Sequence, residues 1–146
     1  MGQQQLLIIV MAFIIVGIGV VAGIMIYTDN AIDRNRDAVM SDLLNLTARA
    51  QAYYRRPSIY GGGQGSFVGL NNDLQGMRKL VNTMSYPWIT DNGRYRISTA
   101  GTAIRVVLNG IGNEPGKDPN SPVTVTIAVY SDSISLITTG GPLIAN

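Results

Sequence analysis

Residues 6–27 of the sequence read LLIIVMAFIIVGIGVVAGIMIY, and the expected architecture follows from this segment. It carries no charged side chain, and the first charged side chain in the whole chain is that of Asp29. An α-helix rises about 1.5 Å per residue, so residues 6–27 would form a helix roughly 33 Å long, which matches the hydrocarbon core of a bilayer. We therefore predict a membrane-inserted helix over residues 1–28.

A secretory signal peptide is the competing interpretation of this segment. Such a peptide has a basic start, a shorter apolar stretch and a small-residue cleavage site. Here the chain starts MGQQQ, without Lys or Arg, and no Ala-x-Ala pattern follows the apolar stretch. We expect the segment to stay on the protein.

The helix is expected to continue through residues 29–56, because no Pro occurs before Pro57 and no Gly lies between Gly23 and Gly61. Apolar residues recur here at steps of seven, four and three, which is a heptad-like seam on one helix face. The seam consists of Ile32, Val39, Leu43, Leu46, Ala50 and Tyr53. We predict one helix of about 50 residues, roughly 75 Å long, whose second half packs its seam against the rest of the chain.

Pro57 and the Gly-rich run at 61–65 end this helix and begin a connecting segment over residues 57–86. Asn72 and Asp73 are suitable N-cap residues for a short helix over residues 74–84.

The remaining residues, 87–146, show the short alternating runs that are typical of strands. The predicted strands are residues 88–90, 94–98, 102–108, 123–130 and 133–139. The Asp-Asn-Gly sequence at 91–93 predicts a hairpin turn, and residues 109–122 are expected to form a turn-rich connection. The fold class is therefore α+β, with an antiparallel sheet of about four strands packed on the amphipathic half of the long helix.

Composition excludes several classes of function. The formal net charge is +2 and no basic run is longer than Arg55-Arg56, so we expect no nucleic-acid partner. The chain has no Cys and no His, and Glu114 is its single Glu. General acid–base and nucleophilic catalysis usually depend on these residue types, so we expect neither an enzyme nor a cofactor site.

Three local motifs have ordinary explanations. The run at 61–65 lacks the Lys-Ser/Thr and the preceding strand that a phosphate-binding loop needs. Residues 113–120 offer oxygen ligands for calcium but lack EF-hand spacing, and Lys117 would repel a cation, so we predict no metal site. An aromatic and basic cluster at the end of the long helix is expected to serve packing between helix and sheet. This cluster contains Tyr53, Tyr54, Arg55, Arg56 and Tyr60.

Gly17, Gly19 and Gly23 interrupt the apolar segment, and three interpretations of them stay open. The GxxxG step from Gly19 to Gly23 allows two helices to approach closely. Gly is also common in membrane helices in general. Finally, each Gly costs about 1 kcal/mol against Ala, which weakens the helix locally and allows it to extend or bend.

A long N-terminal helix that is first apolar and then amphipathic, followed by a small antiparallel sheet, resembles type IV pilins and the related pseudopilins. In sequence the resemblance rests on residues 1–55. It implies that the apolar helix halves bundle in the core of a filament while the globular domains form its outer surface. It also implies that subunits wait in the cytoplasmic membrane until an ATP-driven machine extracts them. The expected filament-core positions are Leu6, Ile9, Phe13, Val16, Gly19, Val20, Gly23 and Ile26.

The chain departs from the pilin pattern at recognisable positions. If Met1 is the mature start, Gln5 stands where the family usually has a Glu that pairs with a neighbour's N-terminal amine. Ala22 lies where bacterial pilins often have a Pro. The disulfide-closed loop of many pilins cannot form, because the chain has no Cys.

The resemblance implies a structural subunit of an extracellular type IV pilus-like filament at the cell surface, with a precursor in the cytoplasmic membrane. Its expected partners are further copies of itself, the inner membrane before assembly, and a pilus-type assembly machinery. Two alternatives stay open: a pseudopilin of a type II-like secretion system, and a bitopic membrane-anchored protein that binds a partner. The positive-inside rule favours a cytoplasmic domain, since Arg34 and Arg36 follow the span, unless a basic leader is removed.

Overall fold

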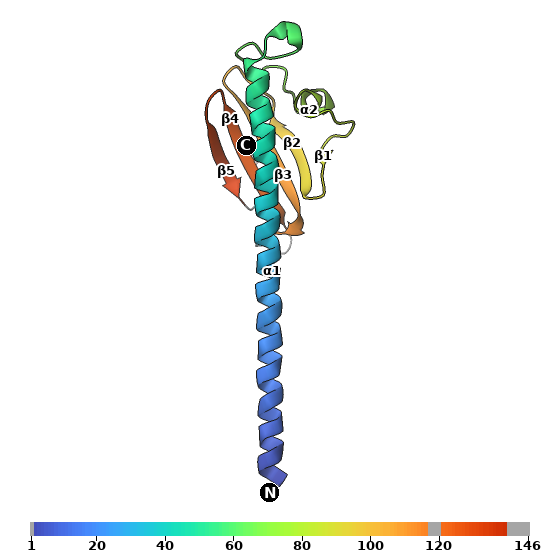
Figure 1. The fold of residues 1–146 in the computed structure, drawn as a ribbon, viewed down its shortest axis with the longest axis vertical. Coiled ribbons are helices and arrows are strands. Elements are labelled where there is room, and N and C mark those ends of the chain that lie inside the picture. Colours follow the sequence, from blue (N-terminus) through green and yellow to red (C-terminus); the bar gives the residue numbers. More distant parts are fainter. Residues whose placement is uncertain (1, 117–120, 140–146) are drawn as a thin grey trace.

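The computed structural model describes residues 2–116 and 121–139 of the chain. Helix α1 (Gly2–Arg55) lies across one face of a five-stranded antiparallel sheet, and its first half projects beyond the sheet as a bare rod (Figure 1). The 54 residues of α1 correspond to about 80 Å of helix. The predicted α+β class, with one long helix packed on an antiparallel sheet, is confirmed.

Helix α1 ends where the sequence loses a backbone donor. The backbone N–H of Arg56 still donates to the Ala52 carbonyl at 3.0 Å, but Pro57 has no N–H with which to continue the ladder. A single 3-10 turn, η1 (Ser58–Tyr60), follows and closes on Gly61 in the left-handed conformation, at φ 74°.

Helix α2 (Leu74–Leu80) begins at the predicted position and ends earlier than predicted. Asp73 caps it, since its Oδ1 accepts a hydrogen bond from the Gly76 N–H at 2.7 Å. The prediction of a helix reaching residue 84 is wrong, because Val81 takes an extended conformation (φ −133°, ψ 138°). The chain then turns so that Val81 and Thr83 are both buried, which one continuing helix would not allow.

The sheet has the strand order β1-β2-β3-β4-β5, and each strand runs antiparallel to its neighbours. Its strands are β1 (Trp88–Ile89), β2 (Gly93–Thr99), β3 (Arg105–Pro115), β4 (Pro122–Tyr130) and β5 (Ile134–Thr139). The count of five includes β1, which has only two residues and pairs with β2 through the predicted hairpin.

The position of β3 corrects the prediction of a strand over residues 102–108 followed by turns over 109–122. The strand begins at Arg105, because the Thr102 side chain accepts a hydrogen bond from the Arg105 N–H at 3.2 Å and holds residues 102–104 in a turn. It continues to Pro115, because residues 109–112 pair with β2 on one side, while residues 109–111 pair with residues 124–126 of β4 on the other and Pro115 pairs with Pro122. Pairing on both edges outweighs the turn preference of the Asn and Gly residues in this stretch.

The core lies between the second half of α1 and the sheet. The structure buries the seam residues Val39, Leu43, Leu46, Ala50 and Tyr53, whereas Ile32 is only half-buried. The first side chain of α1 that is hydrogen-bonded to the sheet region is Asn35, whose amide donates to the Asn92 carbonyl at 3.0 Å. The facing core side chains of the sheet are Tyr95, Ile97, Val106, Leu108, Val125, Ile127 and Val129.

Two glycines of β3 let the helix lie close to the sheet. A Cβ atom on Gly110 would lie 2.8 Å from Val39 Cγ1 and 3.1 Å from Leu43 Cδ1. A Cβ atom on Gly112 would collide with the Asn35 side-chain oxygen. At both positions α1 occupies the space that a side chain would fill, so a larger residue would force the facing side chains of α1 to move.

Candidate assembly surface

The first half of α1 is an apolar rod that no other described part of the chain covers. Its most apolar 18-residue window has a mean hydropathy of 3.0, and none of that window is buried. Even the large rings stay open, with Phe13 75% and Tyr27 77% exposed. By length and composition α1 is apolar enough to cross a membrane.

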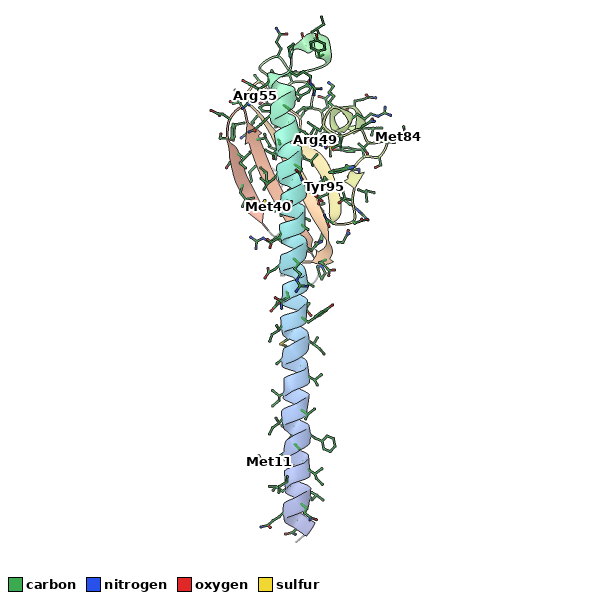
Figure 2. The ribbon with its side chains drawn as sticks, viewed as in Figure 1. Met11, Met40, Arg49, Arg55, Met84 and Tyr95 are labelled. Carbon is green, nitrogen blue, oxygen red and sulfur yellow. The ribbon has the colours of Figure 1, made fainter. Side chains whose placement is uncertain are left out.

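The expected filament-core positions all lie on this rod, on one side of the helix. Figure 2 shows, however, that side chains project from both sides of the rod around Met11. Leu7 and Ile14, which lie off the expected face, are as exposed as Leu6 and Ile9 on it. A helix that is apolar all round is typically surrounded on every side, by lipid or by other helices. The structure therefore supports a fully enclosed rod rather than one adhesive face.

The rod offers a large free energy of association. Full burial of one Val, Leu, Ile, Phe or Met side chain contributes about 1.5–3 kcal/mol. Seventeen large apolar side chains between Leu6 and Tyr27 are exposed. Compared with exposure to water, burial of part of this surface is enough to outweigh the loss of translational and rotational freedom when copies associate.

Three glycines leave gaps on the rod. A Cβ atom built on Gly17, Gly19 or Gly23 would meet nothing within 4 Å. The helix is uninterrupted through all three positions. Gly19 and Gly23 lie one turn apart on the same side, so the backbone of another helix can approach there closely. Gln5 is exposed on the same helix, and its amide can donate and accept hydrogen bonds without carrying a charge.

Charged side chains begin immediately beyond the rod. Those of Asp29, Asp33, Arg34, Arg36 and Asp37 are all exposed, in the interval before the sheet fully covers α1. The surface of α1 thus changes from apolar to charged within about two helical turns. These charged side chains mark the end of the segment that a bilayer or an apolar filament core can enclose.

Asp42 fastens α1 to the β1–β2 hairpin. Its Oδ2 accepts three hydrogen bonds, from Tyr95 Oη at 2.7 Å, from Asn92 Nδ2 at 3.0 Å and from Thr90 Oγ1 at 3.3 Å. Burial, reinforced by the hydrogen bond to the Asp42 carboxylate, raises the pKa of Tyr95 well above its ordinary value of 10.0. Tyr95 therefore stays protonated and donates to Asp42.

The aromatic cluster at the end of α1 packs within the domain. Tyr53 donates to the Val68 carbonyl at 2.9 Å, and the Tyr54 and Phe67 rings lie 4.8 Å apart between centroids. Both contacts tie α1 to the connecting segment. Tyr60 stands apart on η1 and is 75% exposed.

No group of three or more metal-ligating side chains occurs among residues 2–116 and 121–139. Of the oxygen-rich loop considered for calcium, residues 117–120 lie outside the described residues. The Asn113 side-chain amide donates to the Asp91 carbonyl at 2.8 Å, so this side chain joins β3 to the β1–β2 turn.

The predictions from sequence do not include Asp42, which lies one residue from the seam position Leu43 and carries a charge like those on the solvent-facing side of an amphipathic helix. They also place the two glycines of β3 in the turn-rich connection over residues 109–122 rather than in a strand. The one available signal was the unusual grouping of Thr90, Asn92 and Tyr95 around the predicted hairpin. Comparison of the chain with protein-family models, with curated proteins and with solved structures gives no match.

Proposed function

We propose that the chain is a structural subunit of an extracellular type IV pilus-like filament, and that it polymerises by bundling the apolar half of α1. The observation that carries this proposal is one unbroken helix whose first half is bare and whose second half is held by the sheet. Each subunit would contribute a rod to the filament core and a sheet to the outer surface.

The continuity of α1 favours a filament over a simple anchor. A bilayer span needs only about 20 apolar residues and no fixed geometry beyond them. Here the apolar half is the direct extension of a helix that is buried against the sheet at Val39, Leu43 and Leu46. The direction of the rod relative to the domain is therefore fixed, which a regular polymer needs and a membrane tether does not.

The same rod suits the precursor. Before assembly a bilayer would cover its apolar surface, and after assembly the rods of neighbouring copies would do so. Transfer of the rod from the bilayer to the filament core replaces one apolar environment by another. The free-energy change of this transfer is therefore small compared with that of exposing the rod to water.

The test is electron microscopy of the purified full-length chain after slow removal of detergent. The unsubstituted chain should form fibres. Phe13→Asp should abolish them, because a carboxylate would have to enter the apolar core. Ile59→Asp is the matched control, since Ile59 is also a highly exposed apolar side chain but lies on η1, away from the rod.

Gly19→Ile separates the filament from its membrane precursor. This substitution keeps the rod apolar, so membrane insertion should be unchanged, but it fills the gap that close helix packing uses. We expect membrane-inserted protein and no fibres. If the unsubstituted chain stays monomeric or merely dimeric under all conditions, the filament proposal fails and the bitopic alternative is preferred.

A further inference from the structure

An exposed stripe runs along α1 on the flank that lies toward β4 and β5. Its positions advance by alternating steps of four and seven residues, which keeps them on one side of a helix. We define the flank stripe as Ala22, Ile26, Asp33, Asp37, Leu44, Ala48 and Arg55, all of which are exposed. Gln51, seven residues after Leu44, donates to the Tyr130 carbonyl at the end of β4 at 3.3 Å, which fixes the direction of this flank. Figure 2 places Arg55 on this side and Arg49 on the opposite side.

The flank stripe has an unusual chemical order. It is apolar at positions 22 and 26, acidic at positions 33 and 37, apolar again at positions 44 and 48, and basic at position 55. Among the described residues of α1 beyond Tyr27, Leu44 is the one large apolar side chain that stays exposed, at 44%. A single exposed Leu is common on protein surfaces, so Leu44 is informative only together with the other positions of the flank stripe.

The stripe repeats after 22 residues with complementary chemistry. Position 55 is a base where position 33 is an acid. Positions 44 and 48 are apolar, as are positions 22 and 26. A displacement of 22 residues corresponds to roughly 33 Å along the helix axis. Arg55 and Asp33 are therefore far too distant to pair within one chain, so the match can only be used between chains.

We infer that the flank stripe is the contact between two copies of this chain that lie parallel and are displaced by about 33 Å along α1. In this contact Arg55 of one copy pairs with Asp33 of the next, with Asp37 one turn away. Leu44 and Ala48 of the first copy pack on Ala22 and Ile26 of the second. This inference rests on the proposed filament and specifies one of its lateral contacts.

The contact is local to the upper part of the pair. Asp37 and Asp33 of the first copy lie about 10–16 Å of helix below Leu44, at the levels of Ile15 and Met11 of the second copy. Packed helices commonly cross at about 20°, so the two axes have diverged by about 4–6 Å there, and the acidic side chains are displaced sideways from the apolar rod. They remain free to meet the Arg55 side chain of a third copy.

A bilayer is a poorer occupant of this surface than a second copy. Arg55 lies 28 residues beyond Tyr27, or about 42 Å of helix, so it does not reach the headgroups around an inserted rod. A second copy displaced by about 33 Å along the axis brings its Asp33 to the level of Arg55. The same displacement brings its Ala22 and Ile26 to the levels of Leu44 and Ala48.

Cysteine crosslinking tests the contact directly, because the natural chain has no Cys. In filaments of the full chain carrying Asp33→Cys and Arg55→Cys, mild oxidation should give a ladder of disulfide-linked copies. The matched control carries Asp33→Cys and Arg49→Cys, which places the second thiol on the other flank, and should stay monomeric on a denaturing gel. An equal ladder from the control, or from Arg55→Cys alone, overturns the inference.

A charge exchange gives an independent measurement. Arg55→Asp should lower the salt concentration at which filaments dissociate, and adding Asp33→Arg and Asp37→Arg to it should restore that concentration. If all variants form filaments of equal salt stability and no ladder appears, this inference is overturned and the proposed function stands. If the unsubstituted chain forms no filaments, the proposed function itself fails.

Discussion

Replacement of Asp42 by Ala is the sharpest test of how the helix is attached to the sheet. The substitution removes one acceptor oxygen that serves Tyr95, Asn92 and Thr90. Asn92 and Thr90 are half-buried and can turn to water, and the Thr90 bond is long at 3.3 Å. Tyr95 is fully buried and cannot do so, which leaves its hydroxyl without an acceptor.

The magnitude follows from these unequal partners. A buried donor left without a partner costs about 1–3 kcal/mol, and a hydrogen bond to a charged group contributes about 1.5–3 kcal/mol. Because the hydroxyl of Tyr95 dominates, we expect Asp42→Ala to lower the free energy of unfolding by about 2–4 kcal/mol. With a urea slope of about 2 kcal/mol per molar, the middle of the usual range, the midpoint should fall by roughly 1–2 M.

Trp88 provides the assay. It is the single Trp of the chain, and its ring lies 5.3 Å from that of Tyr95. Its fluorescence should report loss of the packing around Asp42 during urea unfolding of the full chain in detergent. Asp37→Ala is the control, since Asp37 is an exposed carboxylate on the same helix and its loss should change stability by less than about 0.5 kcal/mol. If Asp42→Ala unfolds with the same midpoint as the control, the hydrogen bonds to Asp42 do not hold the hairpin to α1, and the reasoning is refuted.

Three further perturbations test the fold. The free energy of unfolding should fall as pH rises above about 10, because Tyr95 ionises in the unfolded chain while its raised pKa keeps it protonated in the folded chain. Urea titrations at several pH values should show a smaller fall for Tyr95→Phe. An equal dependence on pH in the variant and the unsubstituted chain would contradict the assignment. Gly110→Ala should destabilise the domain by about 1–3 kcal/mol through its contact with Val39, whereas Gly17→Ala should not, as thermal unfolding can show. Asp73→Ala should cost about 1 kcal/mol by removing the cap of α2, and Asp73→Asn should recover most of it in the same assay.

Much of the fold could be predicted because its strongest signals are local. Absence of Pro and Gly between Gly23 and Pro57 predicts an unbroken helix, and the period of the seam identifies the side that packs. The hairpin turn at 91–93 fixes the pairing of β1 with β2. These features depend on backbone sterics and side-chain periodicity, which act over a few residues.

Other features could not be predicted because they depend on residues distant in the sequence. Gly110 and Gly112 favour a turn locally, and only pairing on both edges and the approach of α1 make them part of β3. Asp42 resembles any other charge on an amphipathic helix until the β1–β2 hairpin, about 50 residues later, surrounds it with donors. The end of α2 at Leu80 likewise follows from burial of Val81 and Thr83 rather than from helix propensity.

The uncharged apolar half of the long helix and its amphipathic continuation follow from the amino-acid sequence, because composition and period are properties of neighbouring residues. Which positions on that continuation the sheet covers, and which it leaves open, depends on the tertiary structure. The sheet covers the seam and not the flank stripe, since a sheet packs against one side of a cylinder. The open side, with its acidic, apolar and basic positions in order, is therefore a property of the assembled fold.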